Sequence, residues 1–440
     1  MTYDEALKYF HSMHRFGSSL GLSRIKVLLE ALGDPHNELS VIHVAGTNGK
    51  GSTTAMIASM LKQAGIRTGM YISPFLERFT ERISVNGMEI PGEAVADLAP
   101  VIKDACKFTE RACGEHPTEF EAVTAMAFLY FKQQQVECVA LEVGLGGRFD
   151  ATNVVDRPRV SVITRIGMDH MERLGPTLRH IATEKAGIIK PGCPVVSSPQ
   201  ADEAMEVVCA TATSVGSVLR VVGRDMRVVP LSSDLSGQTC SLYSDRLSIS
   251  NLHVPLIGEH QSINAATAVE AVSSSGFSVT PDDIRSGIAA TRWPGRMEVI
   301  SRDPLVILDG AHNPDGANAV VAALARLLPG KRCILVSGVL ADKAVSEMAS
   351  VFARCTRYAV LTRPDSPRAL DPHEYGRYMD TANIRWEVSD SIAHAVDRAL
   401  SLAGPDDFIL ITGSLYLVGA ARTYTRRLFP EYFEQTTKRE

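Results

Sequence analysis

Hydrophobic and polar positions along the chain alternate between short apolar runs, typical of buried strands, and longer stretches with apolar residues at helical spacing. The most informative change lies at residues 41–65. Residues 41–45 form a short, largely β-branched apolar run that predicts a buried strand, and a glycine-rich stretch follows. From Ser52 to Gly65 the pattern predicts a helix. Its apolar stripe consists of Met56, Ile57, Met60 and Leu61.

The glycine-rich stretch, residues 46–52, has the sequence GTNGKGS and the composition of a phosphate-binding loop. Glycines let backbone N–H groups turn toward an anion, the helix N-terminus adds its positive dipole end, and Lys50 adds a cation. The hydroxyl of Ser52 suits a Mg²⁺ ion that bridges phosphates, although the glycine spacing is a variant of the common P-loop. The alternative, a flexible loop, is disfavoured by the flanking strand and helix. The predicted cradle consists of Gly46, Thr47, Asn48, Gly49, Lys50, Gly51 and Ser52.

Two further predicted strands end in side chains that can bind a metal. One follows a helix predicted at residues 118–134 and ends at Glu142. The other, predicted at residues 159–166, is followed by Asp169 and His170. A histidine after a strand is by itself more often a polar residue with ordinary partners, but its coincidence with a carboxylate at a strand end favours a Mg²⁺ site beside the P-loop.

The glycines after Glu142 resemble a dinucleotide-binding fingerprint only superficially. Its third glycine position falls on Phe149, so we exclude an NAD site.

The later part of the chain indicates a second domain. Residues 195–255 predict a β-rich segment with hairpins, residues 258–276 a helix, and the pattern restarts around residues 291–300. From there strands and helices alternate, which predicts a parallel sheet covered on both faces. We therefore expect an α/β protein with a P-loop ATP-binding N-terminal domain, residues 1–295, and a smaller Rossmann-like C-terminal domain, residues 296–440. Polar residues at predicted strand ends of the second domain are Asp309, His312, Asn313 and Ser414.

Composition fits an ordinary globular enzyme with small-molecule partners. The 440 residues exceed what one core usually supports, and the contents of 45% hydrophobic and 22% charged residues are average. A net charge of −5 gives no electrostatic footprint for nucleic acid or an anionic membrane. The eight cysteines form no CxxC pair, no apolar run reaches the roughly 18 residues of a membrane span, and the N-terminus lacks a signal-peptide pattern. We expect a cytoplasmic protein, without a membrane or nucleic-acid partner.

These residues alone leave a kinase, an ATPase and an ATP-dependent ligase open. A set of motifs narrows the choice: AGTNGKGS, YISPFLERFTERI, TEFEAVTAMAF, EVGLGGRFDATN, GMDH, EKAGIIKPG, HQSINAATA, WPGRME, DGAHNPDG and TGSLY. In this order they resemble folylpolyglutamate synthase and dihydrofolate synthase, within the Mur ligase superfamily. The resemblance implies a ligase that joins L-glutamate to a folate derivative through an acyl phosphate while ATP becomes ADP and phosphate. It also implies two Mg²⁺ sites, and we expect a monomer.

The resemblance assigns roles residue by residue. The nucleotide would bind to the residues of the cradle together with Asn264, Arg296 and Asp309. The metal ligands would be Ser52, Ser73, Glu142, His170 and a carboxylated Lys185. Catalysis would involve Lys50, Lys185, His170 and His312. The folate would contact Gly21, Leu22, Phe120, Glu121, Phe149, Asp150 and Ala151, and the glutamate would contact His312 and Ser414.

Two positions bear on whether dihydropteroate is also a substrate. Phe75 in SPFL is similar to monofunctional folylpolyglutamate synthases, whereas Arg148 in GGRFDATN is similar to bifunctional members. Glutamate chain extension is therefore the primary expectation and dihydrofolate synthesis a possible second activity. Two alternatives remain: another Mur-type amide ligase acting on a cell-wall precursor, and a binding protein gated by nucleotide.

Overall fold

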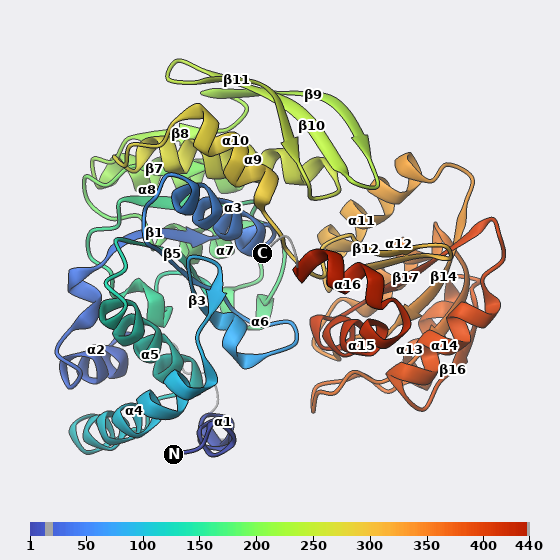
Figure 1. Ribbon diagram of the computed structural model, residues 1–440, viewed down its shortest axis with the longest axis horizontal. Coiled ribbons are helices and arrows are strands. Elements are labelled where there is room, and N and C mark those ends of the chain that lie inside the picture. Colours follow the sequence, from blue (N-terminus) through green and yellow to red (C-terminus); the bar gives the residue numbers. More distant parts are fainter. Residues whose placement is uncertain (14–20, 438–440) are drawn as a thin grey trace. The chain divides into compact units, whose positions relative to one another are not determined.

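The structure is a computed structural model that describes residues 1–13 and 21–437 (Figure 1). This part of the chain divides into two compact units. Unit 1 contains Met1–Val229, Cys240–Leu252 and Ile263–Thr291, and unit 2 contains Pro230–Thr239, His253–Ser262 and the chain from Arg292 onward. Both units combine helices with a mainly parallel sheet, so the predicted α/β class is confirmed.

The sheet of unit 1 has the strand order β4-β3-β2-β5-β1-β6-β7-β8. Strands β2, β5, β1, β6, β7 and β8 pair in parallel, and β3 and β4 add an antiparallel edge. The bounds are β1 Ser40–Ala45, β2 Thr68–Tyr71, β3 Ile83–Val85, β4 Met88–Glu89, β5 Cys138–Glu142, β6 Val160–Ile163, β7 Val195–Ser197 and β8 Leu219–Val221. The strands predicted at residues 41–45 and before Glu142 are confirmed.

The helices predicted at residues 52–65, 118–134 and 258–276 are confirmed as α3, α5 and α9. Thr118 caps its helix through a reciprocal capping box with Glu121. The helix after the glycine loop begins at Lys50, two residues before the predicted Ser52, because Gly49 at φ 87° ends the loop. The bounds are α1 Tyr3–Ser12, α2 Ser23–Glu30, α3 Lys50–Gln63, α4 Gly92–Cys113, α5 Glu119–Gln133, α6 Met171–Leu174, α7 Leu178–Ala186, α8 Asp202–Ser214, α9 Glu259–Ser274 and α10 Pro281–Ala290; short 3₁₀ helices are η2 Pro35–Glu38, η3 Phe79–Arg82 and η4 Ala151–Val154.

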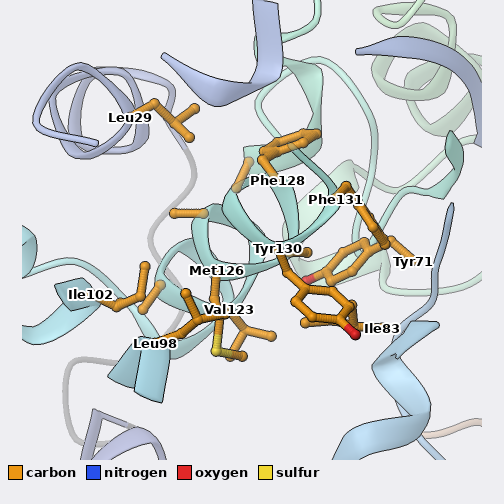
Figure 2. Packing of buried hydrophobic residues seen from close by; sticks show 14 of the residues in the cluster. Leu29, Tyr71, Ile83, Leu98, Ile102, Val123, Met126, Phe128, Tyr130 and Phe131 are labelled. Carbon is orange, nitrogen blue, oxygen red and sulfur yellow. The ribbon is translucent and has the colours of Figure 1, made fainter. Parts of the chain in front are cut away.

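A large apolar core joins α1, α2, α4 and α5 to this sheet. In Figure 2, Leu98 and Ile102 of α4 and Val123 and Met126 of α5 point into this core. Each is buried, and full burial of a side chain of this size contributes about 1.5–3 kcal/mol. The core packs these helices against strands of the sheet whose ends carry the candidate site.

The prediction of a β-rich segment at residues 195–255 is wrong at residues 202–214, although β7 and β8 on either side are strands. Residues 202–214 form α8, whose buried residues Ala204, Val207, Val208 and Ala212 lie on one helical face. The remainder is confirmed as β structure: a sheet of order β11-β10-β9, with β9 Met226–Asp234, β10 Gly237–Ser244 and β11 Ser248–Val254.

The sheet of unit 2 has the order β12-β13-β17-β14-β15-β16. Strands β13, β17, β14, β15 and β16 pair in parallel as predicted. Strand β12 pairs antiparallel with β13, so the prediction of a parallel sheet is wrong at this edge. Only a short turn separates the two strands, which permits antiparallel pairing alone. The bounds are β12 Glu298–Arg302, β13 Leu305–Asp309, β14 Arg332–Ser337, β15 Thr356–Leu361, β16 Arg385–Val388 and β17 Asp407–Thr412, with helices α11 Pro314–Leu327, α12 Val345–Ala353, α13 Pro372–Thr381, α14 Ile392–Leu402, α15 Leu415–Leu428 and α16 Pro430–Thr437.

A buried ion pair fixes β12 of unit 2 to α15. Arg422 Nε and Nη2 donate to both carboxylate oxygens of Glu298 at 2.9–3.0 Å, and both side chains are almost completely buried. We expect Arg422→Met to lower the free energy of unfolding by about 3–5 kcal/mol, because it leaves a buried carboxylate without its cation. Chemical denaturation measures the loss. The matched control is Arg398→Met, whose half-exposed pair with Glu387 should cost about 1 kcal/mol or less; equal losses for the two variants would contradict the argument.

Candidate active site

The candidate residues of unit 1 gather at one edge of its sheet. Strand β1 lies between β5 and β6, with Val44 opposite Glu142 and Ala45 opposite Ile163. The glycine loop, Glu142 and the segment after β6 therefore leave neighbouring strands at their carboxyl ends. In open parallel sheets this edge is where ligands bind.

Two glycines of the loop are required by close neighbours. Gly46 and Gly49 have φ values of 153° and 87°. A side chain at Gly46 would clash with the hydroxyl of Thr164, and one at Gly49 would clash with the amide of Asn264 in α9. The structure thus brings Asn264, predicted to bind nucleotide, against the glycine loop.

Part of the loop is bonded to the segment after β6. The N–H groups of Thr47 and Asn48 donate to the carbonyl of Arg165 at 2.9 and 3.1 Å. The Thr47 hydroxyl exchanges hydrogen bonds of 3.0 Å with the backbone of Gly167. These two N–H groups are therefore used within the protein, a tertiary contact that the sequence did not reveal. The first turn of α3 presents the N–H groups of Lys50, Gly51 and Ser52, which have no intrahelical acceptors.

Lys185 lies buried beside the loop. Its Nζ donates to the carbonyl of Gly46 at 2.7 Å, while Lys50 Nζ lies 3.4 Å from the carbonyl of Thr47. Burial, and secondarily the positive charge of Lys50, lowers the pKa of Lys185 to about 7; Asp169 and Asp150 oppose this shift. A substantial fraction of this amine is therefore uncharged near neutral pH.

The predicted metal ligands only partly meet. The N–H of Ser73 lies 3.4 Å from Glu142 Oε2, so these two residues are adjacent, and Ser52 is buried in the first turn of α3. His170 caps α6 in the left-handed region at φ 53°, and its Nε2 lies 3.8 Å from the carboxylate of Asp169. Asp169, which directly precedes His170, also acts electrostatically on the buried Lys185.

This donor set suits a hard cation. Glu142 and the two hydroxyls supply oxygen, the ligand atom that Mg²⁺ prefers. Over residues 1–13 and 21–437, no three His, Cys, Asp or Glu side chains form a group able to hold a metal. A Mg²⁺ site here therefore depends on hydroxyls, a modified lysine or a ligand oxygen.

Several predicted folate residues lie on the loop after β5 or against it. The N–H of Gly21 donates to the carbonyl of Phe149 at 3.3 Å. The ring of Phe120 packs so close to Gly144 that any side chain at this position would clash with it. Phe149 is 45% exposed. Leu22 precedes α2 beside this contact, and Ala151 is buried. Phe120 and Phe149 thus provide aromatic surface near the edge of the sheet.

Two acidic residues of this group are used inside the protein. Asp150 is 3% exposed and accepts hydrogen bonds from the N–H groups of Leu145 and Thr152. Glu121, also 3% exposed, accepts from the N–H of Thr118 and from Arg24 Nε. Glu121 completes the capping box that its spacing from Thr118 predicts. Asp150 shapes the loop after β5, a role that the motifs did not indicate.

The candidate residues of unit 2 gather at the ends of the paired strands β13 and β17. Asp309 is buried and accepts from the N–H groups of Met297 and Ala311 at 2.8 Å; burial raises its pKa, and Arg296 opposes the shift. The guanidinium of Arg296 lies over Gly310, where a side chain would clash with it.

His312 and Ser414 occupy the same edge of unit 2. His312 Nδ1 donates to the carbonyl of Gly310 at 2.8 Å. Ser414 caps α15, and its hydroxyl accepts from the N–H of Leu417. Asn313 caps α11 directly after His312, so all four predicted strand-end residues of unit 2 follow the neighbouring strands β13 and β17.

Among the helices that the structure describes, none combines the length and the apolar character needed to cross a membrane.

Two family models match the chain. The Mur ligase middle domain matches residues 44–272, and the Mur ligase, glutamate ligase domain matches residues 295–415. Together they place this chain in the class of Mur ligases.

Relatives and solved structures narrow this class. A folylpolyglutamate synthase from Lacticaseibacillus casei is 39% identical over 96% of this chain and 98% of its own length. A dihydrofolate synthase/folylpolyglutamate synthase from Bacillus subtilis is 36% identical over the same shares. A Mycobacterium tuberculosis folylpolyglutamate synthase complexed with ADP and AMPPCP aligns with a TM-score of 0.88 at 33% identity, over 96% of this chain and 98% of that one. The chain belongs to the folylpolyglutamate synthase and dihydrofolate synthase family of Mur ligases, as its motifs indicated.

Proposed function

We propose that this protein is an ATP-dependent ligase that adds L-glutamate to a folate, producing folylpolyglutamates, ADP and phosphate. The observation that carries the proposal is a glycine loop at the end of β1 in a chain similar to folylpolyglutamate synthases over nearly its whole length. A carboxylate is a poor acyl donor, so its oxygen first attacks the γ-phosphorus of ATP and ADP leaves. The glutamate amine then attacks the carbonyl carbon of the acyl phosphate, and phosphate leaves.

The chain's own residues position the nucleotide and neutralise its charge. The N–H groups of Lys50, Gly51 and Ser52 at the start of α3 bind phosphate oxygens, and the ammonium of Lys50 offsets negative charge as it moves from one oxygen to another. The amide of Asn264 packs directly against Gly49 and so helps to hold the glycine loop in place. Phosphoryl transfer needs positioning and charge more than a protein nucleophile.

Mg²⁺ would be held by Glu142, Ser73, Ser52 and His170, with Lys185 as a carboxylated ligand; two such ions are expected. When bound, Mg²⁺ neutralises phosphate charge and polarises the transferred group. Lys185 supports its part of the proposal, since a buried amine with a pKa of about 7 can attack CO₂, and the carbamate replaces a cation by an anionic oxygen donor.

We assign the remaining residues as follows. Residues 1–295 act as the ATPase domain with the folate surface, and residues 296–440 as the ligase domain. Arg296 and Asp309 bind nucleotide, and His312 and Ser414 bind glutamate; their convergence at the ends of β13 and β17 supports this. Phe120 and Phe149 stack on the aromatic part of the folate, while Gly21, Leu22 and Ala151 bound the surface and Asp150 and Glu121 hold it in shape. The protein acts in the cytoplasm as a monomer.

Dihydropteroate is the second proposed substrate. An Escherichia coli relative at 31% identity, TM-score 0.87, has been solved in complex with DHPP and ADP, over 96% of this chain and 98% of that one. The exposed ring of Phe149 in this chain offers an aromatic surface on which a pterin ring can stack.

Parallel reactions test the whole proposal. We expect phosphate release only when Mg²⁺, ATP, glutamate and tetrahydrofolate are present together, with products heavier by one glutamate in mass spectrometry. The same assay with dihydropteroate decides the second activity. Phosphate released at full rate without folate would indicate a simple ATPase, and intact ATP after long incubation would indicate a nucleotide-gated binding protein. Turnover of a nucleotide-sugar peptide alone would indicate another Mur ligase.

A further inference from the structure

A buried histidine in the strand that leads to the glycine loop has no role in the chemistry above. His43 lies in the middle of β1, opposite Leu141 of β5 and Ser161 of β6, and is completely buried. Burying a polar ring costs free energy that an apolar side chain of similar size would avoid. Packing alone therefore does not account for a histidine at this position.

The ring of His43 makes one specific contact. Its Nε2 lies 2.8 Å from the hydroxyl of Thr152, which is also completely buried. That hydroxyl lies 2.5 Å from Asp150 Oδ1. Burial raises the pKa of Asp150, but backbone N–H groups donate to both of its oxygens and favour the carboxylate form. A carboxylate only accepts hydrogen bonds, so the hydroxyl donates to Asp150 and accepts from His43. The proton of the imidazole is thereby assigned to Nε2.

The rest of the ring agrees with this assignment. Nδ1 is buried and has no hydrogen-bond partner among the residues that the structure describes. With the proton on Nε2, the atom left unpaired is an acceptor, which costs less than an unpaired donor. Burial lowers the pKa of His43 to about 3, so the ring stays neutral at physiological pH.

Asp150, the end of this chain of hydrogen bonds, determines the shape of the loop after β5. Its Oδ2 accepts from the N–H of Leu145, and its Oδ1 also accepts from the N–H of Thr152, which closes the turn around Phe149. The neighbouring Asn153 ties the same loop to the end of α7, because its Nδ2 donates to the carbonyls of Arg148 and Gly187. Residues 150–153 are thus held from both sides.

We propose that His43 is a positioning residue for folate: through Thr152 it fixes the carboxylate of Asp150 and holds the loop that carries Phe149 against the strand that ends in the glycine loop. The chain His43 Nε2–H, Thr152 Oγ1–H, Asp150 Oδ1 sets the folate surface without touching the substrate. The inference rests on the folate role proposed for this loop.

Steady-state kinetics with four variants test it. Thr152→Val removes the hydroxyl at nearly constant volume and should raise KM for folate on the order of tenfold, with KM for ATP unchanged, because hydrogen bonds to charged groups are among the stronger ones. His43→Leu should raise it several-fold. The amide of His43→Gln can donate to Thr152 in place of Nε2, so this variant should have a KM for folate within about twofold of that of the unmodified protein. Thr152→Ser keeps the hydroxyl and should behave in the same way.

A control separates positioning from general stability. Thr109→Val removes another completely buried hydroxyl, which donates to the carbonyl of Ala105 within α4. Thr109→Val should lower the thermal midpoint by about as much as Thr152→Val does. It should leave KM for folate and KM for ATP unchanged, since a smaller fraction of active protein changes the maximal rate and not KM. In a double-mutant cycle, His43→Leu and Thr152→Val should be strongly non-additive in folate KM.

Distinct results overturn distinct claims. An unchanged folate KM in His43→Leu, an equal loss in His43→Gln and His43→Leu, or a parallel rise in KM for ATP would each reject the positioning role. Should Thr152→Val fail to fold, the comparison of His43→Leu with His43→Gln still decides. Absence of any glutamylated product with the unmodified protein would instead reject the proposed function.

Discussion

Lys185→Ala is expected to lower kcat on the order of a hundredfold and to regain part of it when acetate or propionate is added at millimolar concentration. The amine lies buried against the carbonyl of Gly46 beside Lys50, where two ammonium groups would both repel a metal ion. A carbamate reverses the charge of one, and a small carboxylate diffusing into the vacated space supplies the same anionic oxygen. Unchanged activity in the variant, or a loss that no carboxylate relieves, would remove the carbamate role.

The sign of the missing charge provides the matched control. Lys50→Ala should also lose activity, but acetate should not restore it, because this site loses a cation.

The unmodified protein allows a separate test of the carbamate by pH. Carboxylation takes the uncharged amine and CO₂ to a carbamate and a proton, and the pKa of about 7 makes the uncharged fraction rise from pH 6 to pH 8. At equal concentrations of dissolved CO₂, protein depleted of CO₂ should therefore recover activity faster at pH 8 than at pH 6.

Much of the fold follows from local patterns in the sequence. The apolar run at β1, the stripe of α3 and the capping box of Thr118 each specify their element, because burial and capping act over a few residues. Helix α8 was missed because its buried side chains are alanine and valine, in a segment where valine and threonine favour strands. The antiparallel edge strand β12 was predictable from the two residues that separate it from β13, since a parallel pair needs a longer crossover.

The candidate site is less predictable than the fold. The glycine-rich composition between a strand and a helix indicated a phosphate loop, the strand end indicated Glu142, and the family resemblance indicated Lys185. The N–H groups of Thr47 and Asn48 donate to the carbonyl of Arg165, in a segment more than a hundred residues away. Local sequence patterns do not reveal such a contact. The burial of Asp150 likewise follows from packing, so motif similarity alone could not separate residues that touch a ligand from residues that hold the site in shape.

Glu142→Gln is expected to raise the Mg²⁺ concentration needed for half-maximal activity about 10- to 100-fold. The carboxylate ends β5 directly beside the glycine loop, is 5% exposed, and lies 3.4 Å from the N–H of Ser73. The amide has the same shape but lacks the charge that attracts the cation. Because the substitution also removes a buried charge, the thermal midpoint without Mg²⁺ should stay equal or rise.

Glu137→Gln provides the matched control at the other end of the same strand. Glu137 is exposed, precedes β5, and accepts a hydrogen bond from the N–H of Arg67. It should leave the Mg²⁺ requirement unchanged, because the opposite end of a parallel strand is remote from the phosphate edge. Titrating Mg²⁺ at saturating ATP, glutamate and folate measures both variants. A normal Mg²⁺ dependence in Glu142→Gln would place the metal elsewhere, and a fall in the thermal midpoint with no change in Mg²⁺ dependence would make Glu142 a structural residue.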